Sequence, residues 1–86
     1  MTTPSPADRL EIRNTTAATL EVMVEVYPDR YLLRPGNEMV IEARLGGSPF
    51  TINPYEGGLQ IYPGDDCGCP VTINGAPVEP DWETPL

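Results

Sequence analysis

Lysine and histidine are both absent from this chain of 86 residues, whose only basic side chains are five arginines. Thirteen acidic residues give the chain a net charge of −8. Nucleic acids and anionic membranes are bound through basic side chains, so we expect neither of them as a partner. An acidic surface suits a basic protein partner, and it also keeps a small protein soluble and monomeric.

The groups that usually activate a nucleophile are therefore missing, because histidine and lysine are the ordinary bases beside a catalytic serine or cysteine. Asp65 and Asp66 are adjacent carboxylates, but neighbours in an extended chain point apart, and after a Pro-Gly pair they are typical of a solvated turn. No loop with the ligand spacing of a calcium site surrounds them. We therefore predict no enzyme activity, no catalytic residues and no cofactor.

Only two cysteines are present, Cys67 and Cys69, and two are too few for a framework of disulfides. On a strand these two side chains would point to the same side, where they could present two thiolates to a soft metal ion. Zinc needs four ligands, usually with two to four residues between paired cysteines, so a second copy of the chain would have to complete the site. We favour small buried apolar residues, while a metal site across a dimer and a redox pair remain alternatives.

Long apolar runs are also absent, so no segment reaches the roughly 18 residues that cross a membrane. The first residues, "MTTPSPADR", have neither a basic start nor an apolar run, and so do not resemble a secretory signal. We expect a soluble, cytoplasmic protein.

Alternation of apolar and polar residues is the strongest pattern that is present. In "LEVMVEVY", residues 20–27, every second side chain is apolar and aliphatic, which predicts a strand with one buried face. Turn signals rich in proline and glycine separate further short runs of this kind, and Asn74-Gly75 favours a tight hairpin. Strands are expected within residues 10–14, 20–27, 31–34, 38–45, 49–53, 59–62, 67–73 and 76–79.

Seven or eight short strands at this spacing are typical of an all-β fold, and we predict one small antiparallel β-sandwich over residues 10–79. Residues 1–9 are expected to form a disordered lead and residues 80–86 a flexible acidic tail. The predicted core consists of Leu10, Ile12, Leu20, Val22, Val24, Val26, Leu32, Met39, Ile41, Phe50, Ile52, Leu59, Ile61, Val71 and Ile73.

The outward positions of two strands suggest an interaction surface. If the two strands share a sheet, acidic residues surround two apolar side chains and an aromatic one on the exposed face. Aromatic and methionine side chains are enriched at interface centres, and a charged surround gives specificity. The residues of this predicted acidic face are Glu21, Met23, Glu25, Tyr27, Glu38, Val40 and Glu42.

The order of these features over residues 10–43 resembles that of small, uncharacterised bacterial all-β proteins. In them a strand pair ends in an acidic-aromatic turn, which is followed by a "Y-x-L-x-PG" pattern and another strand. The resemblance implies a sandwich of the immunoglobulin-like or jelly-roll-like kind and assigns no functional residue.

The leading hypothesis is a non-catalytic protein-protein interaction or self-assembly module that uses the acidic sheet face or an open edge strand. One alternative is an acidic inhibitor or immunity-type protein that blocks a basic target. The other is a metal-binding protein that uses the Cys-x-Cys pair across a dimer. The expected partner is another protein or a second copy of the chain.

Overall fold

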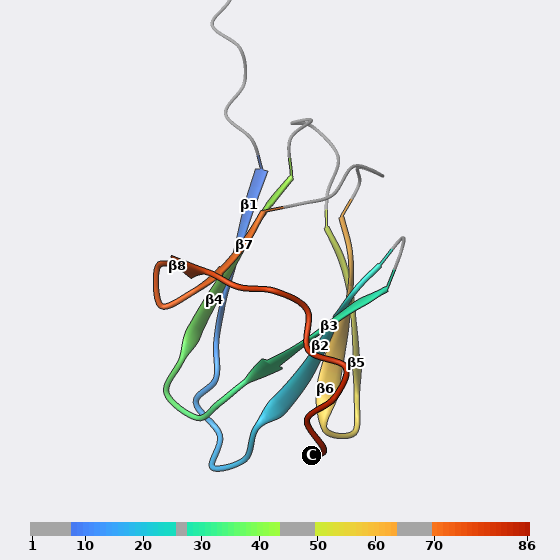
Figure 1. Ribbon diagram of the computed structural model, residues 1–86. Coiled ribbons are helices and arrows are strands. Elements are labelled where there is room, and N and C mark those ends of the chain that lie inside the picture. Colours follow the sequence, from blue (N-terminus) through green and yellow to red (C-terminus); the bar gives the residue numbers. More distant parts are fainter. Residues whose placement is uncertain (1–7, 26–27, 44–49, 64–69) are drawn as a thin grey trace, which may run out of the picture.

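The computed structural model describes residues 8–25, 28–43, 50–63 and 70–86, and within these ranges the chain forms eight strands and no helix (Figure 1). The strands are β1 (Asp8–Arg13), β2 (Leu20–Val24), β3 (Asp29–Leu33), β4 (Glu38–Ala43), β5 (Thr51–Tyr55), β6 (Gly58–Tyr62), β7 (Val71–Ile73) and β8 (Ala76–Pro77). The described residues accordingly contain no helix that is long and apolar enough to span a membrane.

The strands form two four-stranded sheets that pack against each other, so the predicted all-β sandwich is confirmed (Figure 1). Sheet A has the order β1-β4-β7-β8 and sheet B the order β3-β2-β6-β5. Neighbouring strands are antiparallel except β2 and β6, which are parallel with Glu21 opposite Gly58 and Val24 opposite Ile61. Wholly antiparallel pairing was the wrong expectation here. Side-chain alternation does not specify strand direction, which depends on connections that cross between the sheets.

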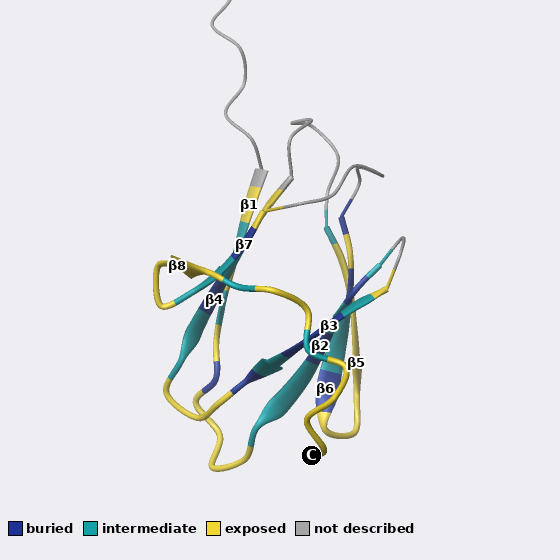
Figure 2. Ribbon diagram, viewed as in Figure 1, coloured by how far each residue is buried: buried dark blue, intermediate teal, exposed yellow. Residues whose placement is uncertain are grey.

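The core lies between the two sheets, as the dark-blue segments in Figure 2 show. Alternate residues of each strand supply it, because successive side chains of a strand point to opposite faces. Six predicted core residues are buried and six more are partly buried against them. The buried core consists of Val22, Val24, Tyr31, Leu33, Met39, Ile41, Ile61 and Val71, and the partly buried residues around it are Leu10, Ile12, Leu20, Phe50, Leu59, Ile73 and Val78.

Two predicted core positions are wrong. In β3 the buried residues are Tyr31 and Leu33, whereas Leu32 is half-buried and lies outside the core cluster. Three successive apolar residues do not fix the phase of a short strand, and the phase is set instead by pairing with β2. Ile52 is 42% exposed because β5 is the edge strand of sheet B. Val26 lies outside the described residues.

The predicted hairpin at Asn74-Gly75 is confirmed, and both residues have positive φ angles, of 52° and 83°. Such angles are required at both central positions of a type I′ turn, where asparagine and glycine are favoured. The Asn74 side chain also accepts a hydrogen bond from the Glu38 backbone N–H at 3.0 Å, which fastens the turn to β4. Pro77 lies in β8 at the edge of sheet A, where a missing N–H is tolerated.

A buried polar residue, Asn14, holds the β1–β2 connection against the β3–β4 turn. Its Nδ2 group donates to the carbonyl oxygens of Ala18 and Leu33, both at 2.8 Å, and its Oδ1 atom accepts from the Thr16 backbone and hydroxyl groups. Its backbone bonds to the neighbouring turn, accepting from the Gly36 N–H at 2.8 Å. A fully buried amide is therefore satisfied on every side, as burial of a polar group requires.

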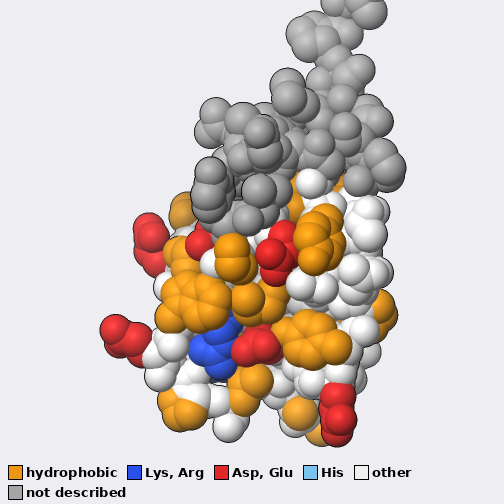
Figure 3. All heavy atoms as spheres, turned by 90° about the vertical axis from the view of Figure 1, so that its right-hand side faces the viewer, with side chains coloured by type: hydrophobic (Ala, Val, Ile, Leu, Met, Phe, Trp, Pro, Cys, Tyr) orange, Lys and Arg blue, Asp and Glu red, His pale blue; other side chains and the backbone are white. Residues whose placement is uncertain are grey.

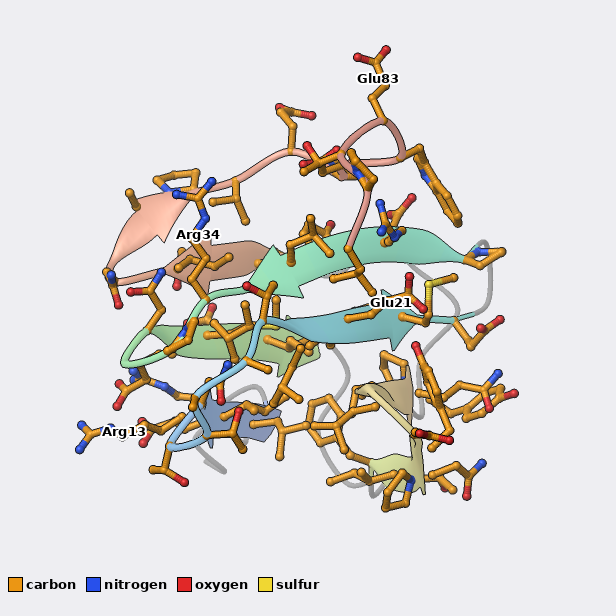
Figure 4. All side chains as sticks on the ribbon, turned by 90° about the horizontal axis from the view of Figure 1, so that it is seen from below. Arg13, Glu21, Arg34 and Glu83 are labelled. Carbon is orange, nitrogen blue, oxygen red and sulfur yellow. The ribbon has the colours of Figure 1, made fainter. Side chains whose placement is uncertain are left out.

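The C-terminal segment, residues 78–86, leaves β8 and crosses to sheet B, where it lies along β3 (Figures 1 and 4). The Asp81 N–H donates to the Arg30 carbonyl oxygen at 2.7 Å. The Arg30 Nη1 atom donates in turn to the carbonyl oxygens of Asp81 and Thr84, at 3.2 and 2.8 Å. The segment expected to be a flexible tail is thus tied to the edge of sheet B.

Candidate interaction surface

The predicted acidic face does not form one surface. Glu21, Met23 and Glu25 belong to β2 and its end in sheet B, whereas Glu38, Val40 and Glu42 belong to β4 in sheet A. The prediction required both strands to share a sheet, so its two halves lie on opposite outer faces of the sandwich. Tyr27 lies outside the described residues.

The β2 half of that set takes part in a polar network on the outer face of sheet B. Arg30 on β3 donates through Nε to Glu21 Oε2 at 2.6 Å, and the Tyr55 hydroxyl group on β5 donates to Glu21 Oε1 at 2.6 Å. The Arg30 side chain is 11% exposed and that of Glu21 is 24% exposed, so this ion pair is largely shielded from water. Figure 4 shows Glu21 beside this sheet, and Gln60 on β6 donates to Glu25 at 3.3 Å nearby.

Both ends of the Tyr55–Glu21 hydrogen bond have shifted pKa values. Hydrogen bonds from Tyr55 and then from Arg30 hold the pKa of the Glu21 carboxyl below its usual value, because they stabilise the charged form. Burial, together with the hydrogen bond to Glu21, raises the pKa of Tyr55 to about 12. The network is therefore a neutral phenol bound to a carboxylate, with an arginine on the other side.

Gly58 explains why Tyr55 lies where it does. The two residues are directly opposite on β6 and β5, and the Tyr55 ring covers the backbone of Gly58, which is buried. A Cβ atom at position 58 would clash with the Glu21 carbonyl oxygen and would lie 2.7 Å from the Tyr55 ring. An aromatic side chain across from a strand glycine is a known way to compensate for the missing side chain.

The large hydrophobic side chains that the described residues expose all belong to sheet B or to the C-terminal segment. They are Ile52, Tyr55, Tyr62, Trp82 and Leu86. Figure 3 views the molecule from the side of sheet B and shows hydrophobic groups lying around acidic groups and a basic one. Aromatic residues are enriched at protein interfaces, whereas charged residues are depleted at interface centres, so this face has the first of these two features only.

The outer edge of β5 has backbone groups that pair with no other strand of the described chain. The carbonyl oxygens of Gly57 and Ile61 accept hydrogen bonds from the N–H groups of Glu21, in β2, and of Glu25, just after β2. Because backbone groups alternate in direction along a strand, those of Gly58, Gln60 and Tyr62 face β5 instead. The β5 residues opposite them, Tyr55, Asn53 and Thr51, direct their N–H and C=O groups toward β6. The backbone groups of Ile52 and Pro54 therefore point away from the sheet.

This edge differs from the other sheet edges in charge and in access. All five β5 residues are exposed and none is charged, although the chain as a whole carries a charge of −8. The sequence of β1, "DRLEIR", has four charged residues among six, and such charges discourage pairing. The C-terminal segment bonds to β3, and β8 has only two residues. The β5 edge is thus the open, uncharged edge of the described sandwich.

A groove of about 660 Å³ lies beneath the C-terminal segment. Tyr31, Leu32, Ile73 and Val78 contribute apolar walls, and the segment itself forms one side through residues 84–86. The Asp81 carboxylate at its rim accepts hydrogen bonds from the backbone N–H groups of residues 83 and 84, both at 3.0 Å. This carboxylate is used to shape the segment.

No metal centre appears in the part of the chain that the structure describes, which contains no cluster of three or more histidine, cysteine or acidic side chains. The candidate ligands Cys67 and Cys69 lie outside the described residues, as do Asp65 and Asp66.

Sequence reasoning missed Arg30 and Tyr55, the two residues that organise sheet B. Arg30 stands in a run that looks like a turn, "YPDRY", and Tyr55 in another, "PYEGG", so the sequence places neither on a strand.

A scan against protein-family models, a search of curated proteins and a search of solved structures each found no match.

Proposed function

We propose that this chain is a non-catalytic protein-interaction module that binds by adding a strand to the outer edge of β5. One observation carries the proposal: in a strongly acidic chain, the outer edge of β5 is fully exposed, is paired with no other strand of the described sandwich and carries no charge. An extended strand laid along this edge would gain backbone hydrogen bonds, and its alternate side chains would supply specificity.

The two rows of side chains on β5 suit such a contact. Ile52 and Pro54 form an apolar row toward the core side, and Thr51, Asn53 and Tyr55 form a polar row on the outer side. A bound strand would cover Ile52, which is 42% exposed although it lies opposite the fully buried Ile61. Burying the remaining surface of a branched aliphatic side chain contributes on the order of 1 kcal/mol.

The test uses two variants that each introduce one lysine at an exposed edge-strand position. Ile52→Lys adds a charge on β5, and the matched control Ala76→Lys adds the same charge on β8, at the far edge of sheet A. Tagged wild-type protein and both tagged variants are each incubated with an extract of the source cells, to which untagged copies of the chain are added, and the bound proteins are recovered. We expect Ile52→Lys to recover at least about tenfold less of the bound partner than the wild type does, because a lysine on an edge strand opposes pairing. Equal recovery by all three proteins would contradict the proposal.

An acidic inhibitor of a basic target is the second candidate, and the outer face of sheet B favours it. Glu21 and Glu25 lie there with the exposed aromatic residue Tyr55, a composition that suits a partner rich in arginine or lysine. Binding of this kind would weaken steeply as salt is added. Strand addition at β5 would not.

We also propose an identity for the fold, a compartment and an alternative metal site. The sandwich is compatible with the small bacterial all-β proteins that residues 10–43 resemble, and the protein is proposed to work in the cytoplasm. A metal site made by Cys67 and Cys69 across a dimer would give stoichiometric metal in the purified protein, lost on Cys69→Ser.

A further inference from the structure

We infer that the strand bound at β5 is β5 of a second copy, paired antiparallel about a twofold axis at Ile52. This inference rests on the proposed function, since it names the partner for the same edge. The result is a dimer in which the two sheets B join into one eight-stranded sheet.

The position of the axis follows from the backbone groups at the open edge. Pro54 has no N–H, so it can accept but not donate a hydrogen bond. With the axis at Ile52, the Ile52 N–H of each copy donates to the Ile52 carbonyl oxygen of the other. Because backbone groups alternate in direction along a strand, the Phe50 N–H also points outward, toward the Pro54 carbonyl oxygen of the second copy. The Ile52 and Pro54 carbonyl oxygens and the Ile52 and Phe50 N–H groups are then paired, which gives four hydrogen bonds, and only the Phe50 carbonyl oxygen, opposite the Pro54 nitrogen, has no donor.

The neighbouring axis, at Asn53, is worse by the same accounting. It places Ile52 opposite Pro54 of the second copy, so each Ile52 N–H finds the Pro54 carbonyl oxygen. Each Ile52 carbonyl oxygen then faces a proline nitrogen, and Phe50 lies opposite Glu56 in the turn after β5, so only two hydrogen bonds form within residues 50–54 instead of four. Each hydrogen bond contributes about 0.5–1.5 kcal/mol, so the axis at Ile52 is favoured.

Side chains agree with the axis at Ile52. Directly opposite residues in this register are Ile52 with its own copy, Phe50 with Pro54, and Thr51 with Asn53. The first two pairs are apolar and lie on the core side, and the third is polar and lies on the outer side. Matched pairs of this kind stabilise a sheet.

The distribution of charge also favours β5 as the contact. Two chains of net charge −8 repel each other. A contact between copies has to be made where charge is lowest, and β5 carries none. Pairing about the twofold axis also covers the β5 edges of both copies at once, so assembly ends at a dimer. A contact of one strand pair is small, so the dimer depends on concentration.

The first measurement is the mass of the purified full chain by sedimentation equilibrium over a range of concentrations. We expect the wild type and Ala76→Lys to shift from monomer to dimer as concentration rises, whereas Ile52→Lys stays monomeric. Circular dichroism confirms that each variant is folded. A wild type that stays monomeric at the highest concentration overturns the inference but leaves strand addition to another protein standing, because the recovery experiment tests that separately.

The second measurement fixes the register by disulfide formation, in chains whose native cysteines are replaced by Cys67→Ser and Cys69→Ser. Thr51→Cys and Asn53→Cys chains, one of them isotopically heavy, are mixed and oxidised. Opposite residues of a non-hydrogen-bonded pair have Cα atoms about 4.5 Å apart, within reach of a disulfide. We expect mixed disulfides between the two chains in excess over disulfides of either chain with itself. An excess of Asn53→Cys homodimers would move the axis to Asn53 and overturn the register, and dimers that form neither disulfide would overturn the β5 contact.

Discussion

Tyr55 has two functions on the outer face of sheet B, because its ring covers Gly58 while its hydroxyl group donates to Glu21 at 2.6 Å. The first compensates for a glycine within a strand. The second orders the Glu21 carboxylate so that its other oxygen faces Arg30. A single side chain on an exposed edge strand thereby connects three strands of the sheet.

The raised pKa of Tyr55 predicts how stability depends on alkaline pH. Because the folded state raises this pKa from about 10 to about 12, folding favours the neutral phenol, and the stabilisation is complete below pH 10. It is lost as the pH rises through 10 to 12. We therefore expect the wild type to lose stability faster over this range than Tyr55→Phe, which keeps the ring over Gly58 and cannot ionise. Urea denaturation at several pH values measures the two slopes, and identical slopes would contradict the assignment.

At the scale of elements, Arg30 links β2, β3 and the C-terminal segment. Its Nε atom binds Glu21, its Nη1 atom binds the carbonyl oxygens of Asp81 and Thr84, and its own carbonyl oxygen accepts from Asp81. The segment covers the β3 edge through these contacts. The sheet thus has one covered edge and one open edge.

Replacing Arg30 measures the contribution of the shielded ion pair to stability, and replacing Arg13 measures that of an exposed ion pair. Arg30→Gln leaves Glu21 with one hydrogen-bond partner fewer in a site only partly open to water, so we expect a loss of about 2 kcal/mol in the free energy of unfolding. Arg13→Gln is the matched control, because the Arg13–Glu38 pair at 2.9 Å is exposed, and we expect a change within about 0.5 kcal/mol. Urea denaturation measures both values. Limited proteolysis should also cut residues 81–86 faster in Arg30→Gln, and equal behaviour of the two variants would contradict this role.

How far the sequence predicts these elements depends on which pattern each one carries. Strict alternation predicted β2 and β4, and Asn74-Gly75 predicted the last hairpin, because each pattern has one physical reading. The phase of β3 could not be read from "YLLR", and Tyr55 was assigned to a turn because proline and glycine flank it. Asn14 and Arg30 could not be foreseen as buried, since Leu33, Asp81 and Thr84, whose carbonyl oxygens they bind, are brought beside them only by the fold.

At the scale of the whole molecule, the sandwich was predictable but the assignment of strands to sheets was not. The alternation that places Met23 and Val40 on outer faces says nothing of whether β2 and β4 share a sheet. They do not, so the predicted acidic face is divided between two sides. The surface that we propose for binding is instead the outer edge of β5, which carries no charge.

Salt dependence follows from this distribution of charge. Two acidic chains that meet at an uncharged strand repel each other over a distance, and raising the salt concentration from about 0.01 to 0.15 M shortens the range of that repulsion from about 30 to 8 Å. The dissociation constant of the β5–β5 dimer should therefore fall severalfold over this range, as measured by sedimentation equilibrium. Glu42→Gln with Glu79→Gln removes two exposed negative charges away from β5, and should tighten the dimer at low salt as added salt does. A dimer that weakens with salt would mean that opposite charges make the contact, which would exclude the β5 edge and favour a charged surface.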